Sequence, residues 1–515
     1  MKNIIIAEYV INLLILLFYY MHMFQLNSYF YKKQIHWMKN NYIKIIKQIL
    51  EITLLTLILI FNNNVAYILS VLLLAVLIFY NFPKKKAKIS LKLTNRVKRM
   101  FMTEIVLILI FLILNINQNV ILIKLYILTI ISPIIVLIAN FINSPIEYLG
   151  KKYYINQAKK IIRDMPNLIV IGVTGSYGKT SVKNFLTKIL SSKYEVLTTP
   201  KNYNTTMGVV KTIRENLKPI HQVFICEMGA TNIGDIKEIC DIVKPKIGII
   251  TAIGPQHLES FKTIDNIIKT KLELANSVAE NGGVTFLNYS NEYLEKEQIK
   301  GKLVTYGINN EKLDYNSYNL KSSSKGISFT TLYRKTKEEI NFKTKLIGKH
   351  NVINITAAIS VADYLEVPLN KMIRAVREIE SVEHRLKPIL NGKMTIIDDS
   401  YNSNPVSFKS ALDTLLEFEG NKIVVTPGLI ELGKDEEKYN FELGQYMTNI
   451  CDYIFLVNSK SAQHILNGIN FKKFDKDKIF NVKTPQEAIS IISKININDK
   501  KVVLLENDLP DNYNI

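Results

Sequence analysis

The segment VTGSYGKTS at Val173–Ser181 constrains the fold of this 515-residue chain more than any other segment. It follows the apolar run Leu168–Val173, which is typical of a buried strand, and it leads into Ser181–Leu190, which is typical of a helix. Its two glycines let the backbone wrap an anion without a Cβ clash, Lys179 can neutralise phosphate charge, and the Thr180 hydroxyl can bind Mg²⁺. A Gly-rich turn between strand and helix therefore predicts a phosphate-binding loop.

Strand-like and helix-like runs alternate after residue 167, which predicts a mostly parallel, doubly wound α/β sheet. The strand-like runs are Leu168–Val173, His221–Met228, Ile247–Ile253 and Gly283–Leu287, and the helix-like runs are Ser181–Leu190, Ile233–Val243, Ile264–Ala279 and Val352–Leu365. A second alternating region begins near Glu383, with strand-like runs at Met394–Ile397, Ile423–Val425, Tyr453–Val457 and Val502–Leu505. We expect this region to form a small Rossmann-like domain that closes over a bound nucleotide.

Polar residues follow two of the strand-like runs beside the phosphate loop. Glu227 ends one of these strands, and a carboxylate at such a position can hold Mg²⁺. His257 follows the other strand, which favours a site role over that of a buried structural histidine. Lys271 lies in a helix-like run, and the pattern alone indicates a solvated helical lysine.

The first third of the chain is apolar and basic. Apolar runs lie at roughly Ile4–Phe24, Tyr42–Phe61, Val65–Tyr80, Phe101–Leu114 and Val120–Phe141. Because a helix needs about 20 apolar residues to cross a bilayer, we expect five spans, with four as the alternative since two runs are short. The first 165 residues contain 20 basic and 5 acidic side chains, so most of the net charge of +20 lies there. That distribution favours a membrane partner over nucleic acid.

The charges between the apolar runs orient the expected spans. Basic residues gather at 32–47, 84–99 and 151–163, whereas the loops 62–64 and 115–119 carry no charge. The positive-inside rule then predicts a multi-pass cell-membrane protein with its N-terminus outside and everything after Ser144 in the cytoplasm. Topology alone accounts for the basic loops, and binding of an anionic lipid or a lipid-linked phosphate is the alternative. We expect a membrane region at 1–144, a linker at 145–166, a nucleotide-binding domain at 167–382 and a C-terminal domain at 383–515.

These segments, in their order, resemble the Mur ligase family. VTGSYGKTS resembles its phosphate-loop signature Thr-Gly-x-x-Gly-Lys-Thr/Ser, which explains why Val173 stands where a standard P-loop has Gly. The other matching segments are NYNTTMG (202–208), CEMGA (226–230), TAIGPQHLE (251–259), TKLEL (270–274), GKHNVINITAA (348–358), HRLKP (384–388), IIDDSYNSNP (396–405) and TPGLIELG (426–433). EMGA and DDSYNSNP are typical of the branch that adds D-alanyl-D-alanine. The resemblance covers about two thirds of the chain, from Leu168 onward.

The resemblance implies ATP-dependent formation of an amide bond. In this family a substrate carboxylate attacks the γ-phosphate and gives an acyl phosphate and ADP. An amine then attacks the acyl carbon, and phosphate leaves. Two negatively charged species must approach each other, so the reaction calls for cations such as Lys179 and Mg²⁺.

The resemblance also implies roles for individual residues. Thr180 and Glu227 would bind Mg²⁺, and His257 would bind a second metal ion together with a carbamate formed on Lys271. Lys179, Lys271, His257 and Arg385 would serve catalysis. The implied nucleotide site comprises Thr174, Gly175, Ser176, Gly178, Lys179, Thr180, Ser181, Asn351 (adenine), Arg385 (phosphate), Asp399 (ribose) and Asn402. The implied substrate side comprises Asn202, Asn204, Thr205, Tyr401 and Asn404.

The chain departs from the family pattern in two places. Members of this type carry a soluble N-terminal domain that binds the UDP-sugar end of the substrate, and here apolar runs stand in its place. The last strand-like run leads into Glu506-Asn507-Asp508-Leu509-Pro510, where a Lys-Gly-Ser type segment is usual. The carboxylates of Glu506 and Asp508 could receive a cationic amine, and a solvated C-terminal turn is the alternative.

The leading interpretation is a membrane-anchored, ATP-dependent amide ligase of cell-wall peptidoglycan precursor synthesis. Addition of D-alanyl-D-alanine to a muramyl peptide is its default reaction. The alternative substrate is a lipid-linked precursor or a γ-linked polyamino acid. Two other classes are a nucleotide-sensing scaffold, which would bind ATP without an amide product, and a transporter driven by ATP. The expected metal-binding residues Glu227, His257 and Lys271 argue against the scaffold. The absence of a second P-loop in the sequence argues against the transporter.

Overall fold

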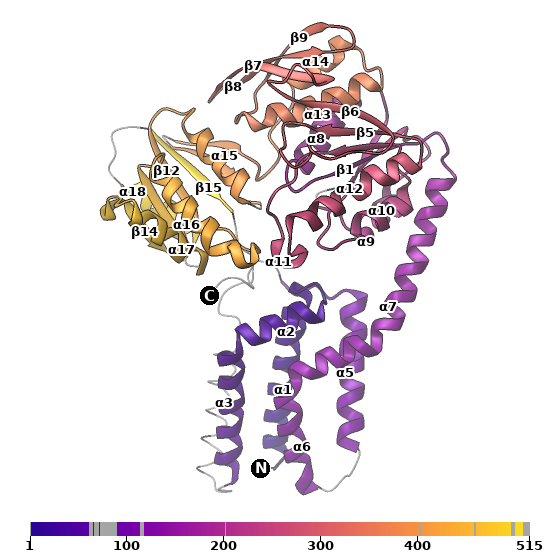
Figure 1. The fold of residues 1–515 in the computed structure, drawn as a ribbon. Helices are drawn as coiled ribbons and strands as arrows, with labels where there is room; N and C mark the ends of the chain where they lie inside the picture. The colour runs from indigo at the N-terminus through magenta and orange to yellow at the C-terminus, as the bar shows by residue number, and fades with distance from the viewer. Residues whose placement is uncertain are drawn as a thin grey trace. The chain divides into compact units, whose positions relative to one another are not determined.

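The computed structural model describes residues 2–60, 65, 69, 72, 90–113, 118–200, 202–392, 394–401, 403–457, 460–495 and 500–507. The chain forms two compact units, one comprising Met1–Lys152 and the other Tyr153–Leu509. The first unit is helical, and the second contains two β-sheets covered by helices (Figure 1).

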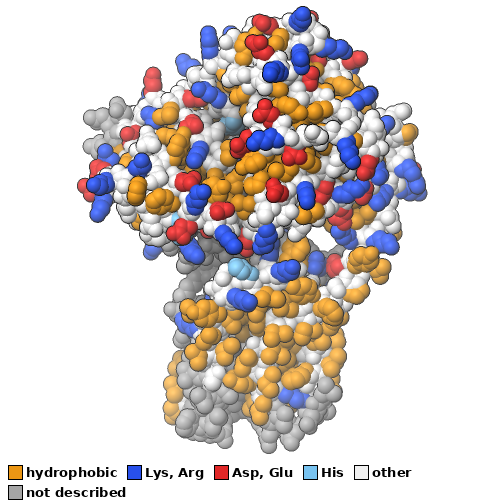
Figure 2. All heavy atoms as spheres, viewed as in Figure 1, with side chains coloured by type: hydrophobic (Ala, Val, Ile, Leu, Met, Phe, Trp, Pro, Cys, Tyr) orange, Lys and Arg blue, Asp and Glu red, His pale blue; other side chains and the backbone are white. Residues whose placement is uncertain are grey.

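The helices of the N-terminal unit pack around a small apolar core. They are α1 (Lys2–Leu26), α2 (Tyr31–Asn40), α3 (Tyr42–Ile60), α5 (Asn95–Ile113), α6 (Gln118–Ile130) and α7 (Ser132–Arg163). One face of α1 is buried, including Leu13 and Leu17, whereas Leu14 and Phe18 on other faces are exposed. Hydrophobic side chains also cover much of the visible surface of this unit (Figure 2). A helix that is apolar on its outer face as well is typical of a lipid-facing segment.

Two helices of the described residues are long and apolar enough to cross a membrane, Ile6–Leu26 and Ser132–Arg163. The five spans expected from the sequence are therefore not reached within the part of the chain that the structure describes. The expected span Val65–Tyr80 lies almost entirely outside the described residues.

The expected fifth span, Val120–Phe141, is wrong as a single helix. It is divided between α6, which ends at Ile130, and α7, which begins at Ser132. Pro133 stands in the first turn of α7, where its missing N–H costs nothing. The stretch expected as a linker, 145–166, is helical as far as Arg163 because α7 continues through Pro145.

The larger sheet of the second unit has the order β2-β3-β1-β4-β5-β6-β7-β8-β9. Its strands are β1 (Ile169–Thr174), β2 (Val196–Thr198), β3 (Val223–Glu227), β4 (Ile247–Ile250), β5 (Val284–Asn288), β6 (Lys302–Ile308), β7 (Tyr315–Ser323), β8 (Gly326–Tyr333) and β9 (Glu338–Thr344). The strands from β2 to β7 pair in parallel, and β8 and β9 add an antiparallel edge. This confirms the mixed α/β fold expected from the alternating pattern.

Helices cover both faces of this sheet, and the strands β1, β3, β4 and β5 are buried on both sides (Figure 1). On one face, α8 (Lys179–Leu190), α13 (His350–Tyr364) and α14 (Leu369–Arg377) contribute to one core cluster. On the other face, α9 (Thr206–Asn216), α10 (Asp235–Val243) and α12 (Ile264–Glu280) contribute to a second, which the short helix α11 (Leu258–Phe261) also joins. Sheets buried in this way bind ligands beyond the carboxyl ends of their strands.

The smaller sheet has the order β10-β11-β15-β12-β13-β14. Its strands are β10 (Lys387–Asn391), β11 (Met394–Asp399), β12 (Asn421–Thr426), β13 (Tyr453–Val457), β14 (Ile479–Val482) and β15 (Lys501–Glu506), all parallel except β10. The helices are α15 (Pro405–Leu415), α16 (Glu436–Met447), α17 (Lys460–Phe471) and α18 (Pro485–Lys494), with short 3-10 turns at Gly433–Asp435 and Lys476–Lys478. The parallel order confirms the expected Rossmann-like C-terminal domain.

Candidate active site

The phosphate loop occupies the four residues between the end of β1 and the start of α8. Gly175 has a φ of +151° and Gly178 a φ of +82°, both in the region that favours glycine. A Cβ on Gly175 would lie 2.1 Å from Thr251 Oγ1, and one on Gly178 would lie 2.7 Å from Asn354 Oδ1. These two positions therefore require glycine both for their backbone conformation and for space.

Segments that follow β3 and β4 hold the loop in place. The Ser176 N–H donates to the Ala252 carbonyl at 2.7 Å, and the Thr251 hydroxyl donates to the Tyr177 carbonyl at 2.5 Å. The Thr174 hydroxyl donates to the Met228 carbonyl at 2.9 Å. The motifs TAIG and EMGA thus support the loop through backbone contacts.

Lys179 begins α8 and turns its ammonium back into the loop. It donates to the carbonyls of Gly175 at 2.6 Å and Ser176 at 3.0 Å. Desolvation lowers the pKa of Lys179 to about 8; the nearby charge of Arg385 acts in the same direction, and that of Glu227 acts against it. An anion at the loop would favour the charged ammonium, as a phosphate-binding lysine requires.

Glu227, at the end of β3, is the buried carboxylate beside the loop. Its Oε1 accepts hydrogen bonds from the Thr180 hydroxyl at 3.1 Å and the Asn204 amide at 3.0 Å. Its Oε2 lies 3.0 Å from the ammonium of Lys183, which is buried as well. The structure therefore brings together Thr180, Glu227 and Asn204, and it adds Lys183, which the sequence reading missed.

The hydroxyl of Thr180 and the carboxylate of Glu227 fit a magnesium ion. Mg²⁺ prefers a few hard oxygen ligands next to phosphate, and these two oxygens already converge within hydrogen-bond distance. Among the described residues, no group of three or more His, Cys, Asp or Glu side chains could hold a metal without further ligands. The donor set therefore suits a metal whose remaining ligands come from phosphate and water.

Lys271, on α12, is buried rather than solvated, so the interpretation from pattern alone is wrong. Its side chain is 3% exposed, and within the described part of the chain its amine has no hydrogen-bond or ion-pair partner. Burial lowers the pKa of Lys271 to about 7, and the neighbouring charge of Lys179 lowers it further, while Asp235 and Glu273 act against them. A substantial fraction of this amine is therefore uncharged at neutral pH.

His257 meets the C-terminal domain. Its Nδ1 lies 2.5 Å from Glu431 Oε2, and the Glu259 N–H donates to the Glu431 carbonyl at 3.2 Å. His257 and Glu431 both have left-handed backbone conformations, with φ of 52° and 62°. Sequence reasoning assigned no role to Glu431, although the TPGLIELG motif that contains it was the available signal.

The C-terminal domain contributes a charged cluster from β11, β15 and the loop before β10. The Arg385 guanidinium lies 4.6 Å from the centre of the Tyr401 ring, and its charge acts on Lys179, as described above. Asp399 Oδ1 accepts from the Leu386 N–H at 3.2 Å. Burial raises the pKa of Asp399 to about 6, and the charge of Arg385 opposes this shift.

Glu506 lies beside Asp399, since the two residues pair in register between β11 and β15. It is fully buried and accepts a hydrogen bond from the Ser403 hydroxyl. Burial and the neighbouring charge of Asp399 raise the pKa of Glu506 well above its usual range. A solvated turn is thus wrong for Glu506, and Asp508 and Asn402 lie outside the described residues.

Several other expected site residues have local structural contacts. Asn351 is buried in the first turn of α13 and donates to the Ile347 carbonyl at 2.8 Å. Thr205 caps α9, and Asn404 caps α15 by accepting from the N–H groups of Val406 and Ser407, both at 3.0 Å. Asn202 and Tyr401 are exposed, and Ser181 lies in the first turn of α8.

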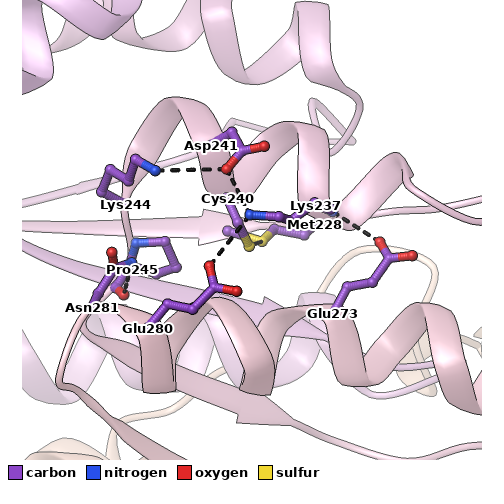
Figure 3. Close-up of polar contacts among 9 residues, drawn as sticks. All are labelled: Met228, Lys237, Cys240, Asp241, Lys244, Pro245, Glu273, Glu280 and Asn281. Atoms are coloured by element: carbon purple, nitrogen blue, oxygen red, sulfur yellow. Dashed lines mark hydrogen bonds and ion pairs between the residues drawn. The ribbon is translucent and has the colours of Figure 1, made fainter.

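A cavity of about 620 Å³ lies at the opposite ends of β1 and β4. It is lined by the apolar residues Val170, Ile242 and Val243 and by basic residues that include Lys159, Lys244 and Lys246. Asp241, which lines the cavity, is paired within the fold, since it lies 2.9 Å from Lys237, and Lys237 also lies 3.4 Å from Glu280 (Figure 3). Because the cavity opens at the amino ends of the strands, it is separate from the phosphate loop.

Two stretches of the chain match known domain families. Residues 173–362 match the Mur ligase middle domain, and residues 384–506 match the Mur ligase, glutamate ligase domain. The UDP-N-acetylmuramoyl-tripeptide–D-alanyl-D-alanine ligase of Buchnera aphidicola subsp. Baizongia pistaciae is 31% identical over 358 residues, which are 67% of this chain and 76% of that protein. The enzyme of the same name from Bacillus subtilis is 28% identical over 329 residues, which are 63% of this chain and 70% of that protein.

Two solved structures of similar fold each cover 70% of this chain. MurF from Acinetobacter baumannii superimposes with a TM-score of 0.62 and 25% identity, over 70% of this chain and 78% of that one. MurF from Thermotoga maritima, in complex with ADP, superimposes with a TM-score of 0.63 and 24% identity, over 70% and 80%. The first 172 residues lie outside both domain matches.

Proposed function

Since the chain belongs to the Mur ligase family, and is thereby an ATP-dependent, ADP-forming ligase, we propose that it is a membrane-anchored enzyme of peptidoglycan precursor synthesis. Its default reaction is the addition of D-alanyl-D-alanine to a muramyl tripeptide, the reaction named for its relatives in Buchnera and Bacillus. The observation that carries the proposal is the phosphate loop, into which Lys179 turns its ammonium and beside which Thr180 is hydrogen-bonded to Glu227.

The reaction proceeds in this proposal through an acyl phosphate. A carboxylate oxygen of the acceptor attacks the γ-phosphorus of ATP, the bond to the bridging oxygen breaks, and ADP leaves. The amine of the second substrate then attacks the acyl carbon and loses a proton, and inorganic phosphate leaves. Lys179 and Arg385 stabilise the negative charge that two anionic reactants bring together, which is the costliest feature of the first step.

Thr180 and Glu227 would hold Mg²⁺, which supplies positive charge to the phosphates when it is bound. Lys271 supports a carbamate, because a buried amine with a pKa of about 7 is uncharged often enough to react with carbon dioxide. The carbamate would replace a cation with an anion at the same position. Together with His257 it would hold a second metal ion after His257 has separated from Glu431.

Membrane attachment is the second part of the proposal. The two long apolar helices and the exposed apolar side chains of the N-terminal unit support it. We further propose that α3, α5 and α6 take part in a multi-pass arrangement with the ligase domains in the cytoplasm, as the distribution of basic loops predicts. Because these helices stand before the ligase domains, a lipid-linked precursor is the candidate acceptor that competes with the UDP-linked one.

Substrate-dependent release of ADP tests the proposal. The full chain in detergent is assayed with a UDP-muramyl tripeptide and D-alanyl-D-alanine, and separately with extracted lipid-linked precursors. We expect ADP and a ligated product by mass spectrometry with the first pair. Turnover with lipid-linked precursors alone would replace the default substrate, and binding of ATP with no amide product from either set would contradict the ligase function.

A further inference from the structure

Lys183 is a buried lysine that the reaction does not use directly. It lies on α8, one turn beyond Lys179, and its side chain is 2% exposed. Its ammonium lies 3.0 Å from Glu227 Oε2 and donates to the Thr199 carbonyl at 2.9 Å. The Thr199 hydroxyl in turn accepts from the Glu227 N–H at 3.1 Å. Lys183 therefore helps to hold Glu227 in place in two ways. It pairs with the Glu227 side chain, and it contacts Thr199, which accepts from the Glu227 backbone.

Folding stability alone does not explain this pair. Desolvating two charges costs about as much as their attraction returns, so a buried ion pair is on average no better than well-packed apolar side chains. Lys183 and Glu227 pair beside the phosphate loop, where charge decides what can bind. This location points to a functional reason for keeping both charges.

The pair balances the charge of Glu227 without a metal, although within the described part of the chain the buried Oε2 accepts no hydrogen bond. Oε2 faces Lys183, and Oε1 accepts from Thr180 and Asn204. Lys183 cancels the charge of Glu227, and Lys179 adds a further positive charge at the same loop. A divalent cation that approaches these residues alone meets net positive charge, whereas one that arrives with the nucleotide's phosphates does not.

We infer that Lys183 is a positioning residue that holds Glu227 as a neutral pair, so that a divalent cation enters the site only together with the nucleotide. The inference rests on the proposed role of Glu227 as a metal ligand. According to this inference, the metal ion binds together with the nucleotide, and the free protein does not bind it. A purely structural role, in which Lys183 only ties α8 to the end of β2, predicts no effect of Lys183 on metal binding.

Binding of Mn²⁺ to the full chain in detergent, followed by electron paramagnetic resonance with and without ATP, tests the inference. The variant Lys183→Met removes the charge and keeps the length, and Lys183→Arg keeps the charge. Lys188→Met is the matched control, since Lys188 lies on the same helix, pairs with Glu378 at 3.1 Å and is about half exposed. Without ATP, we expect Lys183→Met to bind Mn²⁺ at least about tenfold more tightly than the wild type, because one unit of positive charge at contact distance is gone.

With ATP present, we expect the wild type and Lys188→Met to bind Mn²⁺ alike. Equal Mn²⁺ affinity of the wild type and Lys183→Met without ATP, with retained binding in the presence of ATP, would overturn the inference and leave the metal site intact. Failure of the wild type to bind Mn²⁺ even with ATP would instead contradict the proposed metal site, and with it this inference.

Thermal unfolding covers the case in which Lys183→Met is too unstable to study. The double variant Lys183→Met/Glu227→Gln removes both charges, and we expect it to fold, because no uncompensated charge remains buried. We also expect Mn²⁺ alone to raise the Tm of Lys183→Met but not that of the wild type. If the double variant fails to fold as well, Lys183 is needed for packing rather than for charge, and the inference is overturned.

Discussion

The two halves of the candidate site differ in how they are held. The central-domain half is a dense network in which the phosphate loop, Glu227 and Lys183 are each fixed by several buried contacts. The C-terminal half contacts the central domain through separate polar contacts, such as His257 with Glu431 and His350 with Ser410 at 2.9 Å, and through the apolar side chains of Ile347 and Tyr439. A rigid half that binds phosphate and a lightly attached half that brings Arg385 are suited to a site that opens and closes around its substrates.

The largest effect should come from the rigid half. Lys179→Ala removes the cation from a preformed loop, and we expect kcat to fall by about a thousandfold or more, since the stabilisation of transferring phosphate is lost. Substrate-dependent ADP release measures it, with Lys188→Ala as the control on the exposed side of the same helix. Turnover within a few-fold of the wild type would show that the loop is not the phosphate site.

Lys271 lies in the same central-domain half, and its substitution tests whether this buried amine acts as a carbamate. We expect Lys271→Ala to lower kcat by about a hundredfold, on the scale of a lost charge-stabilising group, and short carboxylic acids added to the assay to restore part of the activity. Rescue would follow because a free carboxylate can occupy the position of the carbamate. Loss of activity without any rescue would leave Lys271 as a packing residue.

The lowered pKa of Lys271 also predicts how stability depends on pH. Between pH 7 and its ordinary value near 10.5, the unfolded chain binds more protons at Lys271 than the folded chain does, so stability rises with pH. The slope is at most about 1.4 kcal/mol per pH unit. Chemical denaturation in buffer free of carbon dioxide, compared between wild type and Lys271→Met, measures it. An identical slope in the two proteins would contradict the buried, uncharged amine.

Arg385 tests the lightly attached half. We expect Arg385→Ala to lower kcat by about ten- to a hundredfold while the affinity for ATP changes little, because the central half already holds the phosphates. Steady-state kinetics together with fluorescent nucleotide binding separate the two quantities. A loss of nucleotide affinity as large as the loss in kcat would make Arg385 part of the ground-state binding site.

Glu431 should give the smallest change. Glu431→Gln keeps the shape and weakens the contact with His257, and we expect a change of a few-fold in kcat and faster proteolysis between the two domains, since an exposed polar contact contributes about 1 kcal/mol. Glu437→Gln is the control, because the side chain of Glu437 on α16 is 75% exposed. An abolished activity in Glu431→Gln would place this carboxylate among the reacting groups instead.

The sequence predicted those parts of the site whose signal is local. The glycines, Lys179, Thr180 and Glu227 belong to short motifs at strand ends, and the structure brings these residues together. The burial of Lys183 and Lys271 depends on how α8 and α12 pack against opposite faces of the sheet, and no local pattern carries that information. Asn404 was expected to line the cleft, but its position before Pro405 reads equally well as a helix cap.

The same distinction applies to the fold. Strands β1, β3, β4 and β5 are continuous apolar runs and were predicted, whereas β7–β9 alternate polar and apolar residues and were missed. In the N-terminal unit, apolar composition predicted helices but not the break at Ile131, because composition is nearly the same on both sides of it. Short motifs of functional residues thus predicted the positions of structural elements more accurately than hydrophobic composition did.

Transfer of labelled oxygen tests the central claim most directly. The acceptor is prepared with oxygen-18 in its reacting carboxylate and incubated with ATP, the amine substrate and the full chain, and the released phosphate is analysed by mass spectrometry. The account predicts one oxygen-18 atom in each inorganic phosphate, because the carboxylate oxygen that attacks the γ-phosphorus leaves with it. Unlabelled phosphate accompanied by the ligated product would contradict an acyl phosphate formed at the loop that contains Lys179.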